Sequence, residues 1–420
     1  MTARQLAVKV LYEIDKNGAY TGIELKKQLS SSELSPVDKA FATELVYGVV
    51  KNRTRIDYII SKYSKQKLKK ISEWILNILR IGVYQLIFLD KVPQSAAVNE
   101  SVKLAKRYGH AASSGFVNGI LRNISRNGDV DYPSGREYYE VYYSHPKWLV
   151  DMLFEQYGDG AKTIIENNNA VPNTTIRVNT LKTTPQELTN SLEGKNITVT
   201  KTAEDIMLII SGYGDISNLE EYKKGLFTPQ GISSYIAVKT LEPKENEVVL
   251  DLCSAPGGKT TAMAELSSDK AKIFAFDLYD HKKTLIENNC KRLGIKNVEV
   301  DVADATQIMA DFVGKADKVL ADVPCSGLGI IRKKPDIKWN KDTTDFDEII
   351  KIQKQILNNA SKYLKIGGTL VYSTCTLNKA ENEDVVNDFV TNNGFRIDYM
   401  ETFLPDREYD GFYVCKMIKE

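Results

Sequence analysis

Residues 247–266, EVVLDLCSAPGGKTTAMAEL, decide the fold of the carboxyl-terminal part of the chain. The run EVVLDL has the apolar character of a buried strand, and TAMAEL is typical of a helix. Gly257 and Gly258 lie between them, where a strand-to-helix turn lets the backbone approach a ligand closely. Further β-rich runs alternate with helical stretches, which predicts an α/β Rossmann-like domain whose sheet is mostly parallel. These runs are KIFAFD (272–277), NVEVDV (297–302), DKVLADV (317–323) and GGTLVYS (367–373).

The turn at residues 253–260 resembles the end of a phosphate-binding loop in its Gly258-Lys259-Thr260 triplet. However, Cys253 stands where that loop needs glycine, and Pro256 has no backbone N–H to offer a phosphate. The sequence therefore excludes a nucleoside triphosphatase of the P-loop type.

Acidic residues follow the next two strands of the predicted sheet. Asp277 comes nineteen residues after Gly258, a spacing that suits hydrogen bonds to ribose hydroxyls, and Asp304 follows the third strand. Each carboxylate alone is more simply explained as a cap at a strand end. The ordered set favours an adenosine ligand, for which NAD and S-adenosylmethionine fit equally well.

Two cysteines follow the fourth and fifth strands, Cys325 in DVPCSGLG and Cys375 in VYSTCT. A lone cysteine is usually a small buried side chain, which is what we expect of Cys253, Cys290 and Cys415. Thiols on the ligand side of neighbouring strands suit cytosine methylation, because a thiolate that adds to carbon 6 makes carbon 5 nucleophilic. Asp322 can then hydrogen-bond the base edge. The residues alone do not decide which thiol attacks, and no histidine lies near either motif to serve a cysteine protease.

Length and composition limit the remaining possibilities. The 420 residues suggest two or three domains, and 42% apolar with 26% charged residues is ordinary for a globular protein. Five cysteines without a C-x-x-C pair argue against a disulfide scaffold or a zinc ribbon, and three scattered histidines suggest no metal site. No apolar stretch is long enough to span a membrane. We expect a cytoplasmic protein without metal or membrane association.

The rest of the chain divides into three zones. Residues 1–127 have helical periodicity, including the nearly all-apolar ISEWILNILRIGVYQLIFL (71–89), which predicts the buried helix of a bundle. Residues 128–140 have the composition of a linker, and residues 141–235 predict a small α+β domain. The Rossmann-like domain then occupies residues 236–420.

Charge is unevenly distributed between these zones. Residues 1–140 contain 22 Lys and Arg against 14 Asp and Glu, whereas the other 280 residues contain 34 against 41. A basic cluster can bind phosphates, although a solvated surface or a nuclear signal has the same composition. The cluster consists of Lys62, Lys65, Lys67, Lys69 and Lys70.

Taken together, CSAPGGKT, DVPCSGLG and VYSTCT strongly resemble the RNA (cytosine-5) methyltransferases of the NOL1/NOP2/Sun family. IRKKPDIKW (331–339), Glu381-Asn382-Glu383 and LPDREYDGFYVCKM (404–417) are similar to that family too. RQLAVKVLY, SVKLAKRYG and FVNGILRN resemble the NusB fold, an RNA-binding helical bundle. The combination resembles the bacterial RsmB group, which methylates a cytosine of 16S ribosomal RNA.

The resemblance implies a role for each matching residue. It implies that Cys375 is the nucleophile and that Cys325 helps to resolve the covalent adduct, whereas DNA cytosine-5 enzymes attack with the Pro-Cys thiol. It also implies that S-adenosylmethionine is the cofactor. The matching cofactor positions are Cys253, Ser254, Ala255, Pro256, Gly257, Gly258, Lys259, Asp277, Asp304 and Asp322. One departure is Lys282-Lys283, where the family often has arginine.

RNA contacts are expected from Arg332, Lys333 and Lys334, which follow the Cys325 loop, and from the basic cluster. Trp339 can stack on a base, whereas core packing is the better prediction for Tyr372. The expected partner is 16S ribosomal RNA or a small-subunit assembly intermediate, bound by a monomer. Two alternatives stay open, a non-catalytic RNA-binding or ribosome-assembly factor and a DNA cytosine-5 methyltransferase.

Overall fold

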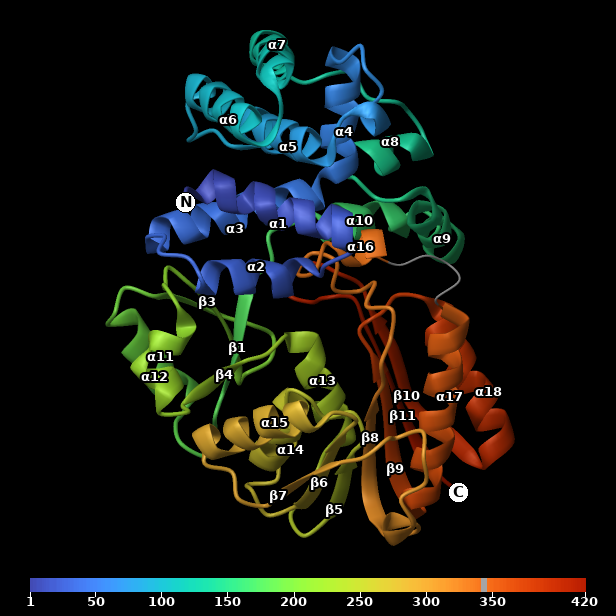
Figure 1. Ribbon diagram of the computed structural model, residues 1–420. Helices are drawn as coiled ribbons and strands as arrows, with labels where there is room; N and C mark the ends of the chain where they lie inside the picture. Colours follow the sequence, from blue (N-terminus) through green and yellow to red (C-terminus); the bar gives the residue numbers. More distant parts are fainter. Residues whose placement is uncertain (341–345) are drawn as a thin grey trace. The chain divides into compact units, whose positions relative to one another are not determined.

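The computed structural model describes residues 1–340 and 346–420 and divides into two compact units (Figure 1). Unit 1 comprises Met1–Asn169 together with Ile331–Lys341. Unit 2 comprises Ala170–Ile330 and Asp342–Glu420. The chain therefore leaves unit 2 six residues after Cys325, contributes a short segment to unit 1, and returns.

Unit 1 is helical throughout its described secondary structure. Ser35 caps one of its helices, since its Oγ accepts a hydrogen bond from the Asp38 backbone N–H at 3.2 Å. The helices are α1 (Ala3–Asn17), α2 (Thr21–Ser30), α3 (Pro36–Lys51), α4 (Arg53–Tyr63), η1 (Leu68–Lys70), α5 (Glu73–Phe88), α6 (Gln94–Tyr108), α7 (Ala111–Asn127), α8 (Arg136–Val141), α9 (Lys147–Tyr157), α10 (Gly160–Asn168) and α16 (Ile337–Asn340).

Helix α5 lies at the centre of the unit 1 core, as its apolar sequence predicts. Ile78, Leu79 and Ile81 are fully buried on it. The charged residue within the run, Arg80, is also buried, and its guanidinium makes a bidentate pair with Asp57 at 2.7 Å and a third bond to Asp15 at 2.6 Å. This pairing explains how an arginine is tolerated inside the bundle.

The smaller sheet of unit 2 is antiparallel, with strand order β2-β3-β1-β4. Its strands are β1 (Thr174–Val178), β2 (Thr198–Lys201), β3 (Met207–Ser211) and β4 (Phe227–Pro229), and its helices are α11 (Pro185–Glu193), η2 (Ile216–Asn218) and α12 (Glu220–Lys223). Thr184 opens α11 with a capping box, in which its side chain and that of Glu187 each accept the other's backbone N–H. Leu188 and Leu192 then pack on β1 in a small separate core.

The larger sheet of unit 2 has the order β10-β11-β9-β8-β5-β6-β7. The strands from β9 to β7 are parallel, and β11 and β10 are antiparallel additions at one side. They are β5 (Val248–Asp251), β6 (Lys272–Asp277), β7 (Val298–Val302), β8 (Ala316–Asp322), β9 (Leu364–Thr374), β10 (Phe395–Phe403) and β11 (Phe412–Lys419). The chain places β6 and β7 on one side of β5 and then β8 and β9 on its other side. The strand order therefore reverses next to β5, and in open sheets ligands bind at such a point.

Helices cover both faces of this sheet (Figure 1). One face packs on α13 (Ile232–Leu241), α14 (Gly258–Leu266) and α15 (Asp280–Leu293), and the other on α17 (Phe346–Tyr363) and α18 (Glu383–Asn393). Alternate residues of β8 divide between the two cores, with Leu320 on the first face and Val319 and Ala321 on the second. Two 3-10 turns, η3 (Ala310–Phe312) and η5 (Lys379–Glu381), lie in the connections.

The expected α/β fold with a helical amino-terminal region is confirmed, and each β-rich run forms a strand. Strands β4, β10 and β11 were not predicted. Helix α8 begins inside the segment expected as a linker, and α9 and α10 belong to unit 1, which extends to Asn169.

Candidate active site

Cys325 and Cys375 meet at the carboxyl ends of adjacent parallel strands. Asp322 at the end of β8 is in register with Ser373 on β9. The two sulfur atoms lie 3.2 Å apart, and both cysteines are partly exposed. A single bound base can therefore be reached by either thiol. Cys290 and Cys415 are buried, as expected of small core residues, whereas Cys253, for which the same was expected, is partly exposed.

The two cysteine loops are held together by a close approach of backbones. The Gly329 N–H donates to the Cys375 carbonyl at 2.9 Å, and the Gly411 N–H donates to the Gly329 carbonyl at 2.8 Å. A Cβ on Gly329 would lie only 2.0 Å from the Gly411 oxygen, so no larger residue fits.

The side chain of Glu381 stabilises the loop that carries Cys325. Its carboxylate is fully buried and accepts four hydrogen bonds, from the backbone N–H (2.8 Å) and hydroxyl (2.5 Å) of Ser326, from Gln353 (3.0 Å) and from Asn378 (3.2 Å). A buried carboxylate needs such donors to satisfy its oxygen atoms. Because Ser326 follows Cys325 directly, the network fixes the Cys325 loop.

The environment keeps Cys325 in its neutral form. Its hydrogen bond to Cys375, its burial and the negative charges of Cys375 and Glu381 raise the pKa of the Cys325 thiol well above its ordinary value. Cys325 therefore keeps its proton beside the sulfur of Cys375.

Asp322 and Lys259 form an ion pair beside the sulfurs. The Lys259 ammonium donates to Asp322 at 2.7 Å and to the Ser234 hydroxyl at 2.9 Å, and the Ser373 hydroxyl donates to the other Asp322 oxygen at 2.7 Å. Burial lowers the pKa of Lys259, but the Asp322 carboxylate and then Cys375 raise it, so that it lies above the ordinary value. Lys259 therefore stays charged close to Cys375.

The turn after β5 is shaped by Ser254 and Gly257. The Ser254 N–H and hydroxyl both donate to the Phe276 carbonyl, at 2.9 and 2.8 Å, which ties the turn to β6. Gly257 has φ +96°, and a Cβ there would lie 3.2 Å from Ile286, so the position requires glycine. Helix α14 begins at Gly258 and presents its N-terminus to this turn.

Acidic groups line the adjoining strand ends. Asp277, at the end of β6, is buried, accepts the Ala255 N–H at 3.1 Å and pairs with Lys282 at 3.1 Å. Asp304 follows β7 and is exposed, and its carboxylate accepts the N–H and hydroxyl of Thr306. Since β5, β6 and β7 are neighbours, the glycine turn and the two carboxylates form one row, which fits an adenosine ligand.

Burial raises the pKa of two further groups near the turn. Burial raises the pKa of Cys253 well above its ordinary value. Burial also raises the pKa of Asp251 to about 7, and the neighbouring Asp322 charge adds to the effect, while the Thr260 hydroxyl donates to Asp251 at 2.7 Å and opposes it. Lys283 pairs with Asp301 rather than with this row.

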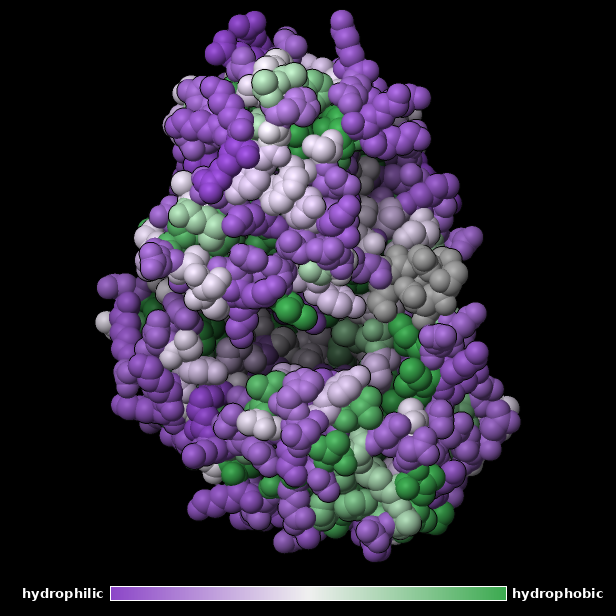
Figure 2. Space-filling model, viewed as in Figure 1, coloured by the Kyte–Doolittle hydropathy of each residue, from purple (hydrophilic) through white to green (hydrophobic). Residues whose placement is uncertain are grey.

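All five lysines of the predicted basic cluster are exposed, on the end of α4, on η1 and between them. Hydrophilic side chains cover much of unit 1 on the face seen in Figure 2. The second set of expected RNA contacts is less exposed than the lysine cluster. It consists of Arg332, Lys333 and Lys334, which belong to unit 1, and Arg332 is only 7% exposed.

Trp339 and Tyr372 both contribute to packing. The Trp339 indole N–H donates to the Val50 carbonyl at 2.8 Å within unit 1. Tyr372 is buried, as predicted, and its hydroxyl donates to the Glu381 backbone carbonyl at 2.7 Å.

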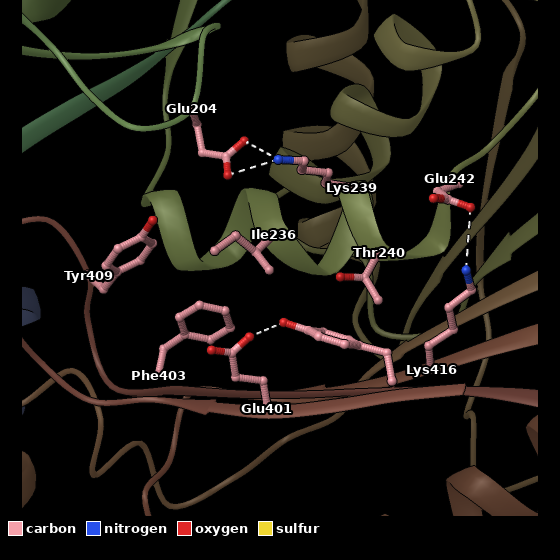
Figure 3. Close-up of a pocket in the computed structure, with 10 residues that line it drawn as sticks. Glu204, Ile236, Lys239, Thr240, Glu242, Glu401, Phe403, Tyr409 and Lys416 are labelled. Atoms are coloured by element: carbon pink, nitrogen blue, oxygen red, sulfur yellow. Dashed lines mark hydrogen bonds and ion pairs between the residues drawn. The ribbon is translucent and has the colours of Figure 1, made fainter. Parts of the chain in front are cut away.

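A separate pocket of unit 2 lies between α13 and strands β10 and β11 (Figure 3). Its charged groups pair with one another, Lys239 with Glu204 at 2.8 Å and Lys416 with Glu242 at 3.3 Å. It contains no cysteine or serine nucleophile, and we assign it no chemistry.

Membrane-spanning and metal-binding features are absent from residues 1–340 and 346–420. No helix in these ranges combines the length and the apolar character that a membrane crossing needs. The same ranges contain no group of three His, Cys, Asp or Glu side chains arranged to hold a metal ion.

Sequence reasoning missed Glu381, Ser326 and Gln353 as residues that support the site. The only signal was the segment Glu381–Glu383, noted as a family resemblance. Their arrangement depends on contacts between residues 28 and 55 positions apart, which no local pattern reveals.

Family models match three parts of the chain. Residues 238–418 match the 16S rRNA methyltransferase RsmB/F model, residues 1–126 match the NusB family, and residues 145–213 match the ferredoxin-like domain of RsmF/B-like methyltransferases. The small antiparallel sheet therefore belongs to a recognised domain type.

Curated relatives are similar over the full length. The chain is 35% identical to the probable ribosomal RNA small subunit methyltransferase B of Bacillus subtilis, covering 100% of this chain and 99% of that protein. It is 30% identical to ribosomal RNA small subunit methyltransferase B of Shewanella oneidensis, again covering 100% and 99%.

Solved structures give the same picture. The crystal structure of the protein PH0851 aligns with a TM-score of 0.82 and 26% identity, covering 100% of this chain and 99% of the other. NSun6 from Pyrococcus horikoshii, crystallised with SFG, aligns with a TM-score of 0.59 and 25% identity over 65% of this chain and 98% of its own.

Proposed function

Because this chain belongs to the ribosomal RNA small subunit methyltransferase B family, we propose that it methylates carbon 5 of a cytosine in 16S ribosomal RNA, using S-adenosylmethionine and a covalent Cys375 adduct. The coarser statement, that it is a small-subunit ribosomal RNA methyltransferase, follows from its full-length similarity. The observation that carries the finer proposal is the pair of sulfurs 3.2 Å apart beside the Lys259–Asp322 ion pair.

The reaction begins with the Cys375 thiolate adding to carbon 6 of the cytosine, which shifts an electron pair onto carbon 5. S-adenosylmethionine, when bound, supplies an electrophilic methyl group, whose bond to sulfur breaks as its bond to carbon 5 forms. Loss of the carbon 5 proton to water and departure of the Cys375 thiolate restore the ring double bond. Covalent attack thus divides one difficult step into easier ones.

Electrostatics support the choice of Cys375 as nucleophile. The charge of Cys375 is among the causes of the raised pKa of Lys259, so that the ammonium and a Cys375 thiolate stabilise each other. The raised pKa of Cys325 keeps its proton in place. A neutral Cys325 thiol can donate a hydrogen bond to the departing Cys375 sulfur, which fits a role in resolving the adduct.

Asp322 suits recognition of the base. Its carboxylate is partly exposed and is oriented from two sides by Lys259 and Ser373. One oxygen can accept the cytosine amino group at the Watson–Crick edge once the base is unstacked and flipped into the site. Lys259 orients the Asp322 carboxylate and adds positive charge where electrons accumulate in the ring.

The glycine turn after β5, together with the carboxylates of Asp277 and Asp304, would hold S-adenosylmethionine. We assign Asp277 to the ribose hydroxyls and Asp304 to the adenine side, with Cys253, Ser254, Ala255, Pro256, Gly257, Gly258 and Lys259 forming the turn. The left-handed Gly257 and the N-terminus of α14 support this assignment. NAD fits the same row in principle, but two thiols beside it have no role in hydride transfer.

RNA affinity is assigned chiefly to unit 1. The five exposed lysines Lys62, Lys65, Lys67, Lys69 and Lys70 can contact phosphates. Of the other set, Lys333 and Lys334 are better placed for contacts than the buried Arg332. The substrate is 16S ribosomal RNA or a small-subunit assembly intermediate, bound by a monomer.

Transfer of label from S-adenosylmethionine to 16S RNA tests the proposal, with bisulfite mapping of the product. Cys375→Ala should abolish transfer, because no adduct forms. Cys325→Ala should accumulate a protein–RNA adduct that survives denaturation. Cys415→Ala, a buried thiol on β11, is the matched control and should behave as the unaltered protein.

Normal transfer by Cys375→Ala would remove this residue from the mechanism. Label entering DNA rather than RNA would support a DNA cytosine-5 methyltransferase instead. Full function in cells with Cys375→Ala would support a non-catalytic assembly factor.

A further inference from the structure

Arg177 on β1 is buried and uses every N–H of its guanidinium in a hydrogen bond. It makes a bidentate ion pair with Glu265 at 2.8 and 2.9 Å. It also donates to the Gly258 carbonyl at 2.7 Å, to the Thr261 hydroxyl at 3.0 Å and to the Gln230 side-chain carbonyl. Its exposed fraction is 0%.

The partners of Arg177 all lie on or beside α14, the helix that begins at the glycine turn after β5. Gly258 begins α14, Thr261 lies in its first turn and Glu265 in its last. The Thr261 hydroxyl in addition donates to the Gly257 carbonyl at 2.8 Å. Arg177 is thus linked to the left-handed Gly257 of the turn by two hydrogen bonds that share the Thr261 hydroxyl.

Helix stability alone does not explain this arrangement. Arg177 is bonded to both the first residue and the last turn of α14, so the helix dipole opposes this cation at one end and favours it at the other. A buried ion pair is often no more stabilising than apolar residues of similar volume. What a guanidinium adds is geometry, since its planar fork fixes several acceptors at once.

The small domain that contains β1 also contacts α15, the helix that follows Asp277. The Asn179 amide donates to the Leu293 carbonyl at the end of α15, at 2.9 Å. In return, Arg292 of α15 donates to the Phe227 carbonyl at 2.8 Å and the Thr228 hydroxyl at 3.0 Å. The small domain is therefore bonded to α14 through Arg177 on β1, and to α15 through Asn179 and strand β4. These are the helices that follow the glycine turn and Asp277.

We propose that Arg177 is a positioning residue for the cofactor site, through which the ferredoxin-like domain fixes the turn Ser254–Gly258. This inference rests on the proposed function, because it takes the ligand of that turn to be S-adenosylmethionine. Arg177 touches neither ligand nor base and acts through Gly258 and Thr261. The small domain then serves cofactor binding, in addition to any contact with RNA.

Titration calorimetry with S-adenosylhomocysteine tests the proposal on the full chain. Arg177→Lys keeps the charge but cannot span Glu265, Gly258 and Thr261 together, and we expect Kd to rise by roughly tenfold. The KM for RNA should stay unchanged. The matched control is Arg80→Lys in unit 1, which also loses a bidentate buried pair and should lower Tm while Kd stays the same.

A second variant covers the case in which Arg177→Lys does not fold. Thr261→Val removes only the hydroxyl that links Arg177 to Gly257 and should weaken binding by about threefold. Unchanged Kd in folded Arg177→Lys, or in Thr261→Val if the former does not fold, would overturn the inference. Failure of the unaltered protein to bind the probe would instead overturn the proposed function, and this inference with it.

Discussion

The two units differ in net charge and in the setting of the cations to which a function is assigned. Unit 1 contains 29 Lys and Arg against 19 Asp and Glu, and unit 2 contains 27 against 36. The lysine cluster of unit 1 is exposed, whereas Lys259 and Arg177 of unit 2 are held by Asp322 and Glu265. Exposed cations attract a polyanion at long range, and fixed ones orient reacting groups. The comparison predicts different consequences of removing charge in each unit.

The largest effect is expected from Lys259→Met in unit 2. It removes the ammonium that orients Asp322 and stabilises charge near Cys375, so kcat should fall between roughly 100- and 1000-fold. Steady-state methyl transfer measures this. Lys270→Met, at an exposed lysine of the same unit, is the control. If Lys259→Met kept kcat within a factor of three of the control, the buried cation would have no part in the chemistry.

The second effect depends on pH and belongs to Asp251. Its pKa of about 7 exceeds the ordinary 3.8, so the folded protein retains the proton longer than the unfolded chain does. The protonated Asp251 therefore contributes its full stability to the fold below about pH 4. This contribution is lost as the pH rises through 7, where the carboxyl ionises in the folded protein. The stability of the unaltered protein relative to Asp251→Asn should therefore fall by about 2 to 3 kcal/mol between pH 5 and pH 8.

Denaturant unfolding at the two pH values measures this difference. Asn can still accept the Thr260 hydroxyl, so the variant isolates the ionisation. A difference independent of pH would mean that Asp251 does not titrate in this range.

A smaller effect, dependent on salt, is expected in unit 1. Replacing Lys62, Lys65, Lys67, Lys69 and Lys70 by Gln should weaken RNA binding by roughly tenfold at moderate salt and lower the salt slope by about 2 to 4. The kcat at saturating RNA should not change. The matched control replaces five exposed lysines of unit 2, namely Lys244, Lys270, Lys272, Lys296 and Lys365. Equal losses in both proteins would show that only net charge matters.

Local patterns in the sequence were sufficient for the strand ends and the cysteine pair. An apolar run followed by a glycine turn specifies its structure within a few residues, and parallel strands bring their ends together. Arg177 could not be assigned in this way, because a single arginine in TTIRVNT has the alternation of a half-exposed strand. Only its packing on α14, 81 residues further on, explains it. For the same reason Arg332 was expected as an RNA contact although it is buried.

The smallest effect concerns the segment that unit 1 receives after the Cys325 loop. Trp339→Phe keeps an aromatic ring but removes the indole N–H that donates to Val50, leaving that carbonyl without this donor. The loss should be about 1 kcal/mol of stability, observed as a Tm shift of a few degrees. S-adenosylhomocysteine binding should not change, because the bond lies wholly within unit 1. A weaker Kd for this probe would mean that the segment also influences the cofactor site, and the separation of roles between the units would then be incomplete.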